Sequence, residues 1–237
     1  MPSLPYRQVH LDFHTSGEIP EVGAAFDPAE FRRGLENAAI DSITCFSVCH
    51  HGYSYHPTRV GVMHPGLKFD LLRAQMDAAH EAGAAGPVYL SAGGNDVAAL
   101  AHPEWCEVNP PGVGGWGAPD ERTPGFRKLC FNTPYLDYLC RLTDETLERF
   151  PDADGLFFDI ILQCQCVCPK CVADMRAAGL DPESEADRLE FSQRVLINYY
   201  ERIAETVRKH NPEMPVFHNS GHVTVGKTGI LKYFSHL

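Results

Sequence analysis

The sequence lacks both a cluster of basic residues and a long apolar run. Its 237 residues carry 20 Lys and Arg against 31 Asp and Glu, which gives a formal net charge of −11. An acidic chain without a basic patch repels phosphate backbones and anionic lipid surfaces, so we expect no nucleic acid and no membrane as partners. No apolar stretch approaches the ~20 residues that a membrane-spanning helix requires.

The sequence also lacks the start of an export signal. Residues 1–6 (MPSLPY) contain neither a basic segment nor an apolar one. We therefore expect a cytoplasmic protein, whose 9 cysteines are free thiols or metal ligands rather than a disulfide framework. The composition, 44% hydrophobic and 22% charged, is typical of a globular chain with one large core, and it leaves a homo-oligomer open.

What the sequence does contain is an alternation of β-rich and helical segments. Strands are predicted at 7–14, 42–49, 87–91, 154–162 and 215–219, with a sixth beginning at 233–237. Helices are predicted to begin at Asp27–Pro28 and to cover 69–82, 134–150 and 185–209. Repeated β–α units form parallel sheets, and polar residues at several strand ends favour an α/β fold of the (β/α)8 TIM barrel type, with its site at that face.

Only about six strands fit into this chain, which is fewer than a closed barrel of eight needs. Residues 93–133 have the Gly/Pro-rich composition of a long insertion, and Leu237 falls inside an apolar run. We therefore expect residues 1–237 to be a single barrel domain, an incomplete N-terminal portion that continues beyond the C-terminus. The alternative is a complete open sheet of six strands.

Segment 154–162 (DGLFFDIIL) places one acid inside an apolar run. A short apolar run bounded by turn residues predicts a strand that is buried on both faces. An ionised carboxylate there is costly unless it is paired or lies where a site opens. Asp159 lies near the C-terminal end of the strand, where parallel α/β folds build their sites, so it is the first catalytic candidate. The alternative is a buried acid paired with an Arg or His of a neighbouring strand.

Histidine recurs at the ends of the other predicted strands. The candidate substrate-binding residues that follow the first, second and fifth strands are His14, His50, His51, Tyr53, His218 and Asn219. Neutral imidazoles and amides beside aromatic rings suit neutral polyhydroxylated ligands, so a carbohydrate is the expected partner. The alternative is that these histidines are ordinary core or surface residues.

Several of these segments resemble the α-L-fucosidase family, and within this group of glycoside hydrolase barrels the set named hypothetical glycosyl hydrolase 6. The resemblance is carried, in the same order along the chain, by residues 12–17 (DFHTSG), 50–53 (HHGY), 70–72 (DLL), 88–91 (VYLS) and 157–159 (FFD). It implies a retaining glycosidase that needs no cofactor for its chemistry. It also implies Asp159 as nucleophile, with His14, His50 and His51 contacting sugar hydroxyls.

The sequence departs from the family pattern at positions that leave the identity of the sugar undetermined. Gly52 follows His51 directly where the family has an Asp, and Thr15 stands where it has a Trp. A retaining enzyme also needs a second carboxyl group about 5–5.5 Å from the nucleophile. In the related enzymes that group comes from a later part of the barrel. Loop acids of this chain that have no supporting motif are Glu18, Asp96, Glu104 and Glu107.

A cluster of cysteines follows the Asp159 strand directly. Segment 164–171 (CQCVCPKC) contains four thiols, and the spacing of Cys168 and Cys171 suits a turn that presents two thiolates to one zinc ion. Cys166 is the third candidate ligand, and either Cys164 or the distant Cys130 is the fourth. We expect a structural zinc site that stiffens this loop; the alternative is a set of reduced thiols that pack it.

Two functions compete with a glycosidase at this point. A barrel that binds carbohydrate without hydrolysing it would explain the unassigned second acid. A zinc-dependent hydrolase with Cys and His ligands would explain the cysteine cluster.

Overall fold

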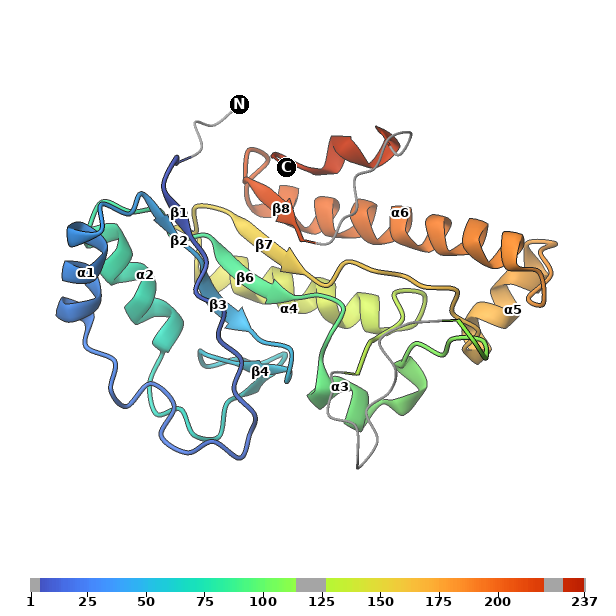
Figure 1. Ribbon diagram of the computed structural model, residues 1–237, viewed down its shortest axis with the longest axis horizontal. Helices are drawn as coiled ribbons and strands as arrows, with labels where there is room; N and C mark the ends of the chain where they lie inside the picture. The colour runs from blue at the N-terminus through green and yellow to red at the C-terminus, as the bar shows by residue number, and fades with distance from the viewer. Residues whose placement is uncertain (1–4, 114–126, 220–227, 237) are drawn as a thin grey trace.

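The computed structural model describes residues 5–113, 127–219 and 228–236 (Figure 1). Its centre is a six-stranded sheet in the order β5-β4-β3-β6-β7-β8. The four strands that run parallel to one another, in the order in which they occur along the chain, are β3 (Cys45–Val48), β6 (Val88–Ser91), β7 (Leu156–Asp159) and β8 (Val216–His218).

A fifth parallel position comes from the start of the chain. β1 (Gln8–Val9) pairs with β2 (Ser42–Ile43), and β2 leads into β3 across Thr44. β1, β2/β3, β6, β7 and β8 therefore lie side by side in sequence order, as Figure 1 shows. This is an α/β fold with sequential parallel strands, as predicted, but the described residues do not close into a barrel.

Three of the four long helices begin at a capping side chain, whereas α4 (Tyr135–Arg149) begins after Pro134 without one. The other three are α1 (Pro28–Asn37), α2 (Leu71–Glu81) and α6 (Glu185–His210). The side chain of Asp27 accepts from the Glu30 amide at the start of α1, and Asp70 and Ser184 cap α2 and α6 in the same way. α1 packs on α2 and α4 packs on α6, which covers one face of the sheet.

Successive side chains of the strands alternate between two buried clusters, one on each face of the sheet. Val48, Leu90 and Phe158 belong to the large cluster under the helices. Phe46 and Tyr89 belong to a smaller cluster on the opposite face, and Phe157 packs against it. The Phe46 and Tyr89 rings stack with centroids 4.0 Å apart. By the two-residue period of a strand, Asp159 shares the face of Phe157, so it lies on the face away from the helices.

The structure differs from the predicted elements at both ends of the chain. The first strand is confined to Gln8–Val9 rather than 7–14, and the segment from Leu11 to Gly17 is irregular. The predicted sixth strand, 233–237, is not formed over residues 233–236: Thr228–Tyr233 form a 3-10 helix (η2) that packs on α6, and beyond it the Ser235 amide makes a hydrogen bond to the Val216 carbonyl of β8 at 3.1 Å. Leu237, whose apolar setting suggested that strand, lies outside the described residues.

Several short elements were not predicted. They are β4 (Tyr53–Ser54), β5 (Val62–Met63), α3 (Asp96–Ala101), the 3-10 helix η1 (Pro103–Trp105) and α5 (Pro169–Ala177). α3 and η1 lie within the predicted insertion 93–133, which returns to the sheet where the Leu129 amide donates to the Gly93 carbonyl at 2.9 Å. Among the described helices, none combines the length and apolar character that crossing a membrane requires.

Candidate active site

The Asp159 carboxylate lies at the C-terminal end of β7 and is held by neutral donors. Tyr89 Oη donates to Oδ2 at 2.8 Å, and Asn219 Nδ2 donates to Oδ1 at 2.6 Å. The amide of Ile160 also donates to Oδ1, at 2.8 Å. The side chain keeps 13% of its surface exposed. These contacts fix the orientation of the carboxylate while leaving it accessible.

His50 lies against this carboxylate as a neutral imidazole. Its Nε2 is 3.5 Å from Asp159 Oδ2, and its Nδ1 is 2.8 Å from Ser91 Oγ, which donates to the Gly94 carbonyl at 2.6 Å. Burial, together with the neighbouring His14, lowers the pKa of His50 from 6.5 to about 4. At neutral pH the pair is therefore not an ion pair.

His14 and His51 extend the site on either side of His50. The rings of His14 and His50 stack with centroids 3.8 Å apart, and His14 Nε2 is 2.8 Å from Asp12 Oδ1. His51 Nδ1 lies 3.6 Å from Asp96 Oδ2. Burial lowers the pKa of both His14 and His51, so all three imidazoles favour the neutral form. The structure thus brings together the first three histidines that the sequence singled out.

Tyr53 borders this group from β4. Its ring meets that of His64 with centroids 5.1 Å apart, and its hydroxyl lies so close to Gly17 that a Cβ there would be 2.5 Å away. Tyr53 therefore packs against the turn that follows His14. Its predicted contact with a sugar stays a prediction.

The two candidates at the end of β8 lie on opposite faces of the sheet. Asn219 reaches Asp159, as described above. His218 instead pairs with Phe158 and points into the helix layer, where its Nδ1 is 3.3 Å from Tyr199 Oη and its ring packs edge-on against Tyr200. Burial lowers the pKa of His218 to about 3. We therefore place His218 in the core rather than beside the substrate.

Tyr89 and Ser91 contact the site but were not among the predicted site residues. Both lie in β6, whose segment 88–91 carries part of the family resemblance and ends in the polar Ser91, but no role was assigned to either side chain. The two-residue period puts them on the same face as Phe157 and Asp159, and Ser91 is in register with Asp159. Burial raises the pKa of Tyr89, so its hydroxyl stays protonated and can donate to Asp159. The sequence signal that could have identified them is the two-residue alternation of side chains along β6, which separates the residues of one face from those of the other.

The turn after Asp159 has a strained backbone. Ile160 has φ of 59°, a left-handed conformation that a β-branched side chain rarely adopts. The amides of Ala92 and Gly93 both donate to the Asp159 carbonyl, and a Cβ on Gly93 would lie 2.0 Å from the Ile160 carbonyl oxygen. Local strain of this kind persists only where the surroundings hold it, and it is common at functional sites.

The four candidate acids have different surroundings. Glu18 and Glu104 are exposed. Asp96 faces His51 and accepts from the Arg127 amide at 2.9 Å. Glu107 forms a buried ion pair with Lys128 at 2.6 Å, and it also accepts from the Cys164 amide. Glu107 therefore has a structural role, and the acid/base partner of Asp159 stays unassigned.

The predicted metal ligands Cys166, Cys168 and Cys171 lie together, and Cys130 joins them. The Cys164 sulfur instead lies 3.7 Å from Lys128 Nζ. The structure thus selects Cys130 over Cys164 as the fourth member of the group. A separate cavity of about 320 Å³ lies at the other end of the strands, lined by Pro87, Asp154 and Pro215 among others, and we assign it no substrate.

Comparison with known proteins gives the chain a family. The model of the family described as hypothetical glycosyl hydrolase 6 matches residues 27–160. The chain is also similar to the structure of alpha-L-fucosidase isoenzyme 2 from Paenibacillus thiaminolyticus, with 39% identity and a TM-score of 0.93. That match covers 98% of this chain and 35% of the fucosidase, so the chain spans about a third of its length.

More distant structures share the fold alone. A beta-galactosidase from the psychrophilic Marinomonas ef1 has 14% identity and a TM-score of 0.62, over 89% of this chain and 36% of its own. The glycoside hydrolase domain of PgaB (BpsB) from Bordetella bronchiseptica has 16% identity and a TM-score of 0.58, over 81% of this chain and 58% of its own. None of the curated proteins matches the chain.

Proposed function

Because the chain belongs to the hypothetical glycosyl hydrolase 6 family, we propose that it carries the nucleophile side of a retaining glycosidase site, with Asp159 as nucleophile. The observation that carries this proposal is the Asp159 carboxylate itself, which is oriented by three neutral donors, Tyr89, Asn219 and the backbone amide of Ile160. A buried acid that served only the fold would be expected to pair with a cation. Its nearest histidine is neutral instead.

In a retaining reaction, an oxygen of Asp159 attacks the anomeric carbon of the sugar. The bond from that carbon to the leaving oxygen breaks, and the leaving oxygen takes a proton from the acid/base carboxyl group. Water, deprotonated by the same group, then attacks the anomeric carbon and releases the sugar and the Asp159 carboxylate. The orientation of Asp159 by three donors contributes to this chemistry because it presets the direction of attack.

The neutral polar groups around Asp159 favour a neutral hydroxylated ligand. A neutral imidazole carries one donor and one acceptor nitrogen, the polarity that hydroxyl groups match, and His14, His50 and His51 all favour this neutral form. Tyr53 supplies an aromatic face at the edge of this group. An α-L-fucoside is the first substrate to test, because the similar structure with 39% identity is named an alpha-L-fucosidase.

The experiment compares Asp159→Gly with the wild-type full-length protein on aryl glycosides, the α-L-fucoside first. We expect the variant to lose turnover, and added azide to restore it by forming a glycosyl azide of inverted configuration. Asp154→Asn is the matched control, because Asp154 precedes the same strand and its carboxylate contacts His80 and the Gly86 amide instead. The control should keep wild-type turnover.

Two results would contradict the proposal. Unchanged turnover of Asp159→Gly would remove Asp159 from the chemistry, and an inverted first product in a proton NMR time course would exclude a retaining route. Sugar binding by the wild-type protein in titration calorimetry, without hydrolysis of any glycoside in the panel, would favour a carbohydrate-binding barrel instead.

A further inference from the structure

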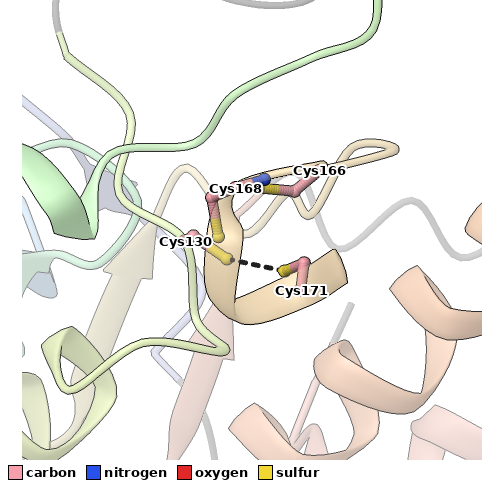
Figure 2. Close-up of side chains that lie close together, drawn as sticks. All are labelled: Cys130, Cys166, Cys168 and Cys171. Atoms are coloured by element: carbon pink, nitrogen blue, oxygen red, sulfur yellow. Dashed lines mark hydrogen bonds between the residues drawn. The ribbon is translucent and has the colours of Figure 1, made fainter. Parts of the chain in front are cut away.

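Four cysteine sulfurs converge from two segments that are distant in sequence. Figure 2 shows Cys130, from the segment that precedes α4, facing Cys166, Cys168 and Cys171, from the loop after β7 and the first turn of α5. The four sulfurs all lie within 4.8 Å of one another. The sulfurs of Cys130 and Cys171 are 3.4 Å apart.

These spacings match the ligand shell of one small tetrahedral ion. Zinc–thiolate bonds are about 2.3 Å long, so two sulfurs of a tetrahedral site lie about 3.8 Å apart. The observed separations are compatible with that value, since Cys130 and Cys171 are 3.4 Å apart and no pair exceeds 4.8 Å. A disulfide needs a sulfur–sulfur distance of about 2.0 Å, which the Cys130–Cys171 pair does not show. Convergence of four sulfurs on one point also exceeds what the packing of small apolar side chains requires.

The surroundings suit thiolates as well as thiols. The amides of Val108 and Cys168 donate to the Cys166 sulfur, each at 3.4 Å, and the side chain of Gln163 donates to the Cys130 sulfur at the same distance. Cys168 is the N-cap of α5 and Cys171 lies in its first turn, where unpaired amides and the helix dipole favour negative charge. N–H donors of this kind offset the charge that four thiolates would otherwise concentrate.

We propose that Cys130, Cys166, Cys168 and Cys171 bind one zinc ion as a structural tetrathiolate site. All four side chains are buried, with at most 3% of their surface exposed. A catalytic zinc keeps one position open for water or substrate, whereas four buried sulfurs fill the coordination shell. This assignment separates the cysteine cluster from the proposed hydrolytic chemistry, and it does not depend on Asp159 being a nucleophile.

The site would join the insertion to the loop that leaves Asp159. On one side, the Cys130 amide donates to the Trp105 carbonyl at 2.8 Å, which connects Cys130 to η1. On the other side, Gln163 bridges the two segments, because it also accepts from the Phe131 amide at 3.1 Å. Zinc binding would therefore hold residues 127–133 against residues 160–168, and metal loss would release both.

The test begins with the full-length protein purified under reducing conditions without added chelator. We expect one equivalent of zinc per chain by elemental analysis, and the cobalt-substituted protein should show the intense thiolate charge-transfer absorption of a tetrahedral site. Cys130→Ser should lower the zinc content and weaken that absorption. Cys164→Ser is the matched control, because Cys164 shares the loop but lies outside the cluster; it should retain both.

A second readout concerns the role of the site. Removal of the ion should increase hydrogen exchange at residues 127–133 and 160–168, and zinc should restore protection. The inference is overturned by a reduced protein that takes up neither zinc nor cobalt, by iron in place of zinc, or by a Cys130–Cys171 disulfide. It is also overturned if Cys164→Ser, rather than Cys130→Ser, loses the cobalt signal. If Cys130→Ser does not fold, the metal content of the wild-type and Cys164→Ser proteins decides.

Discussion

The substitution His218→Phe tests whether a histidine beside the proposed sugar site belongs to the core. The His218 side chain packs among Tyr199, Tyr200 and Phe234, and 4% of its surface is exposed. Burial lowers its pKa from 6.5 to about 3 because the charged imidazolium loses its hydration there. An aromatic replacement of similar size should therefore fit this position.

The expected effect follows from proton linkage. Between the folded pKa of about 3 and the unfolded value of 6.5, the unfolded chain binds more protons than the folded one. The free energy of unfolding therefore falls as the pH is lowered through 6.5. From pH 7 to pH 5, this single group accounts for a loss of about 2 kcal/mol. A folded pKa one unit higher would change that figure by only about 0.1 kcal/mol, so the prediction does not depend on the exact value.

The assay is urea unfolding of the wild-type and variant full-length proteins at pH 7 and pH 5. At pH 7, His218→Phe should be less stable by roughly 1 kcal/mol, because Tyr199 loses a hydrogen-bond partner in the core. Its stability loss between pH 7 and pH 5 should be about 2 kcal/mol smaller than in the wild type. Tyr199→Phe is the matched control: it removes the same 3.3 Å contact but keeps the titrating group, so it should retain the wild-type pH dependence.

Two outcomes would refute this reasoning. An equal loss of stability in the wild type and in His218→Phe between the two pH values would mean that the imidazole is not held neutral in the folded state. A raised KM with unchanged stability would place His218 at the substrate, as the sequence first suggested.

Two further predictions concern the surroundings of Asp159. Tyr89→Phe removes the 2.8 Å hydrogen bond to the carboxylate, so kcat of the full-length enzyme should fall roughly 10- to 100-fold with little change in KM; an unchanged kcat would exclude an orienting role. Gly93→Ala should lower the free energy of unfolding by about 2 kcal/mol or more, because its Cβ would meet the Ile160 carbonyl at 2.0 Å. By contrast, Gly34→Ala in α1, where a Cβ meets nothing within 4 Å, should raise it by about 0.5–1 kcal/mol, and urea unfolding that reversed this order would contradict the local geometry.

The long elements could be predicted because their signals are local. Asp27, Asp70 and Ser184 are capping residues whose hydrogen bonds involve amides three positions along the chain, so the helix starts are legible from sequence alone. The strand predicted to begin at Tyr233 is not formed for a related reason. Tyr233 ends η2, which packs on the long helix α6, and an apolar run alone does not say whether its partner is a strand or a helix.

The site could be predicted only as far as single strands allowed. Asp159 stood out because a charge in an apolar run is visible in one segment. Tyr89 did not, because its contact with Asp159 depends on the pairing of β6 with β7, which no local pattern specifies. The choice of Cys130 over Cys164 required the same kind of knowledge, since Cys130 lies 36 positions or more from the other cysteines of the cluster.

The strained turn at Ile160 lies between the two proposed sites, the Asp159 carboxylate and the cysteine cluster. A left-handed residue directly after Asp159 turns the chain out of β7, and the Ile161 amide then donates to the Asn219 carbonyl at 3.3 Å. Asn219 therefore holds the turn by its backbone and the carboxylate by its side chain.

The left-handed conformation of Ile160 costs on the order of 1–3 kcal/mol, so it needs restraint from the chain on both sides of it. The sheet provides one restraint through Ala92 and Gly93. The cysteine cluster, which begins seven positions after Asp159, provides the other if it binds zinc. Loss of the metal should then relax the turn before it affects the sheet, so exchange at the Ile160 amide should rise while the amides of β7 stay protected.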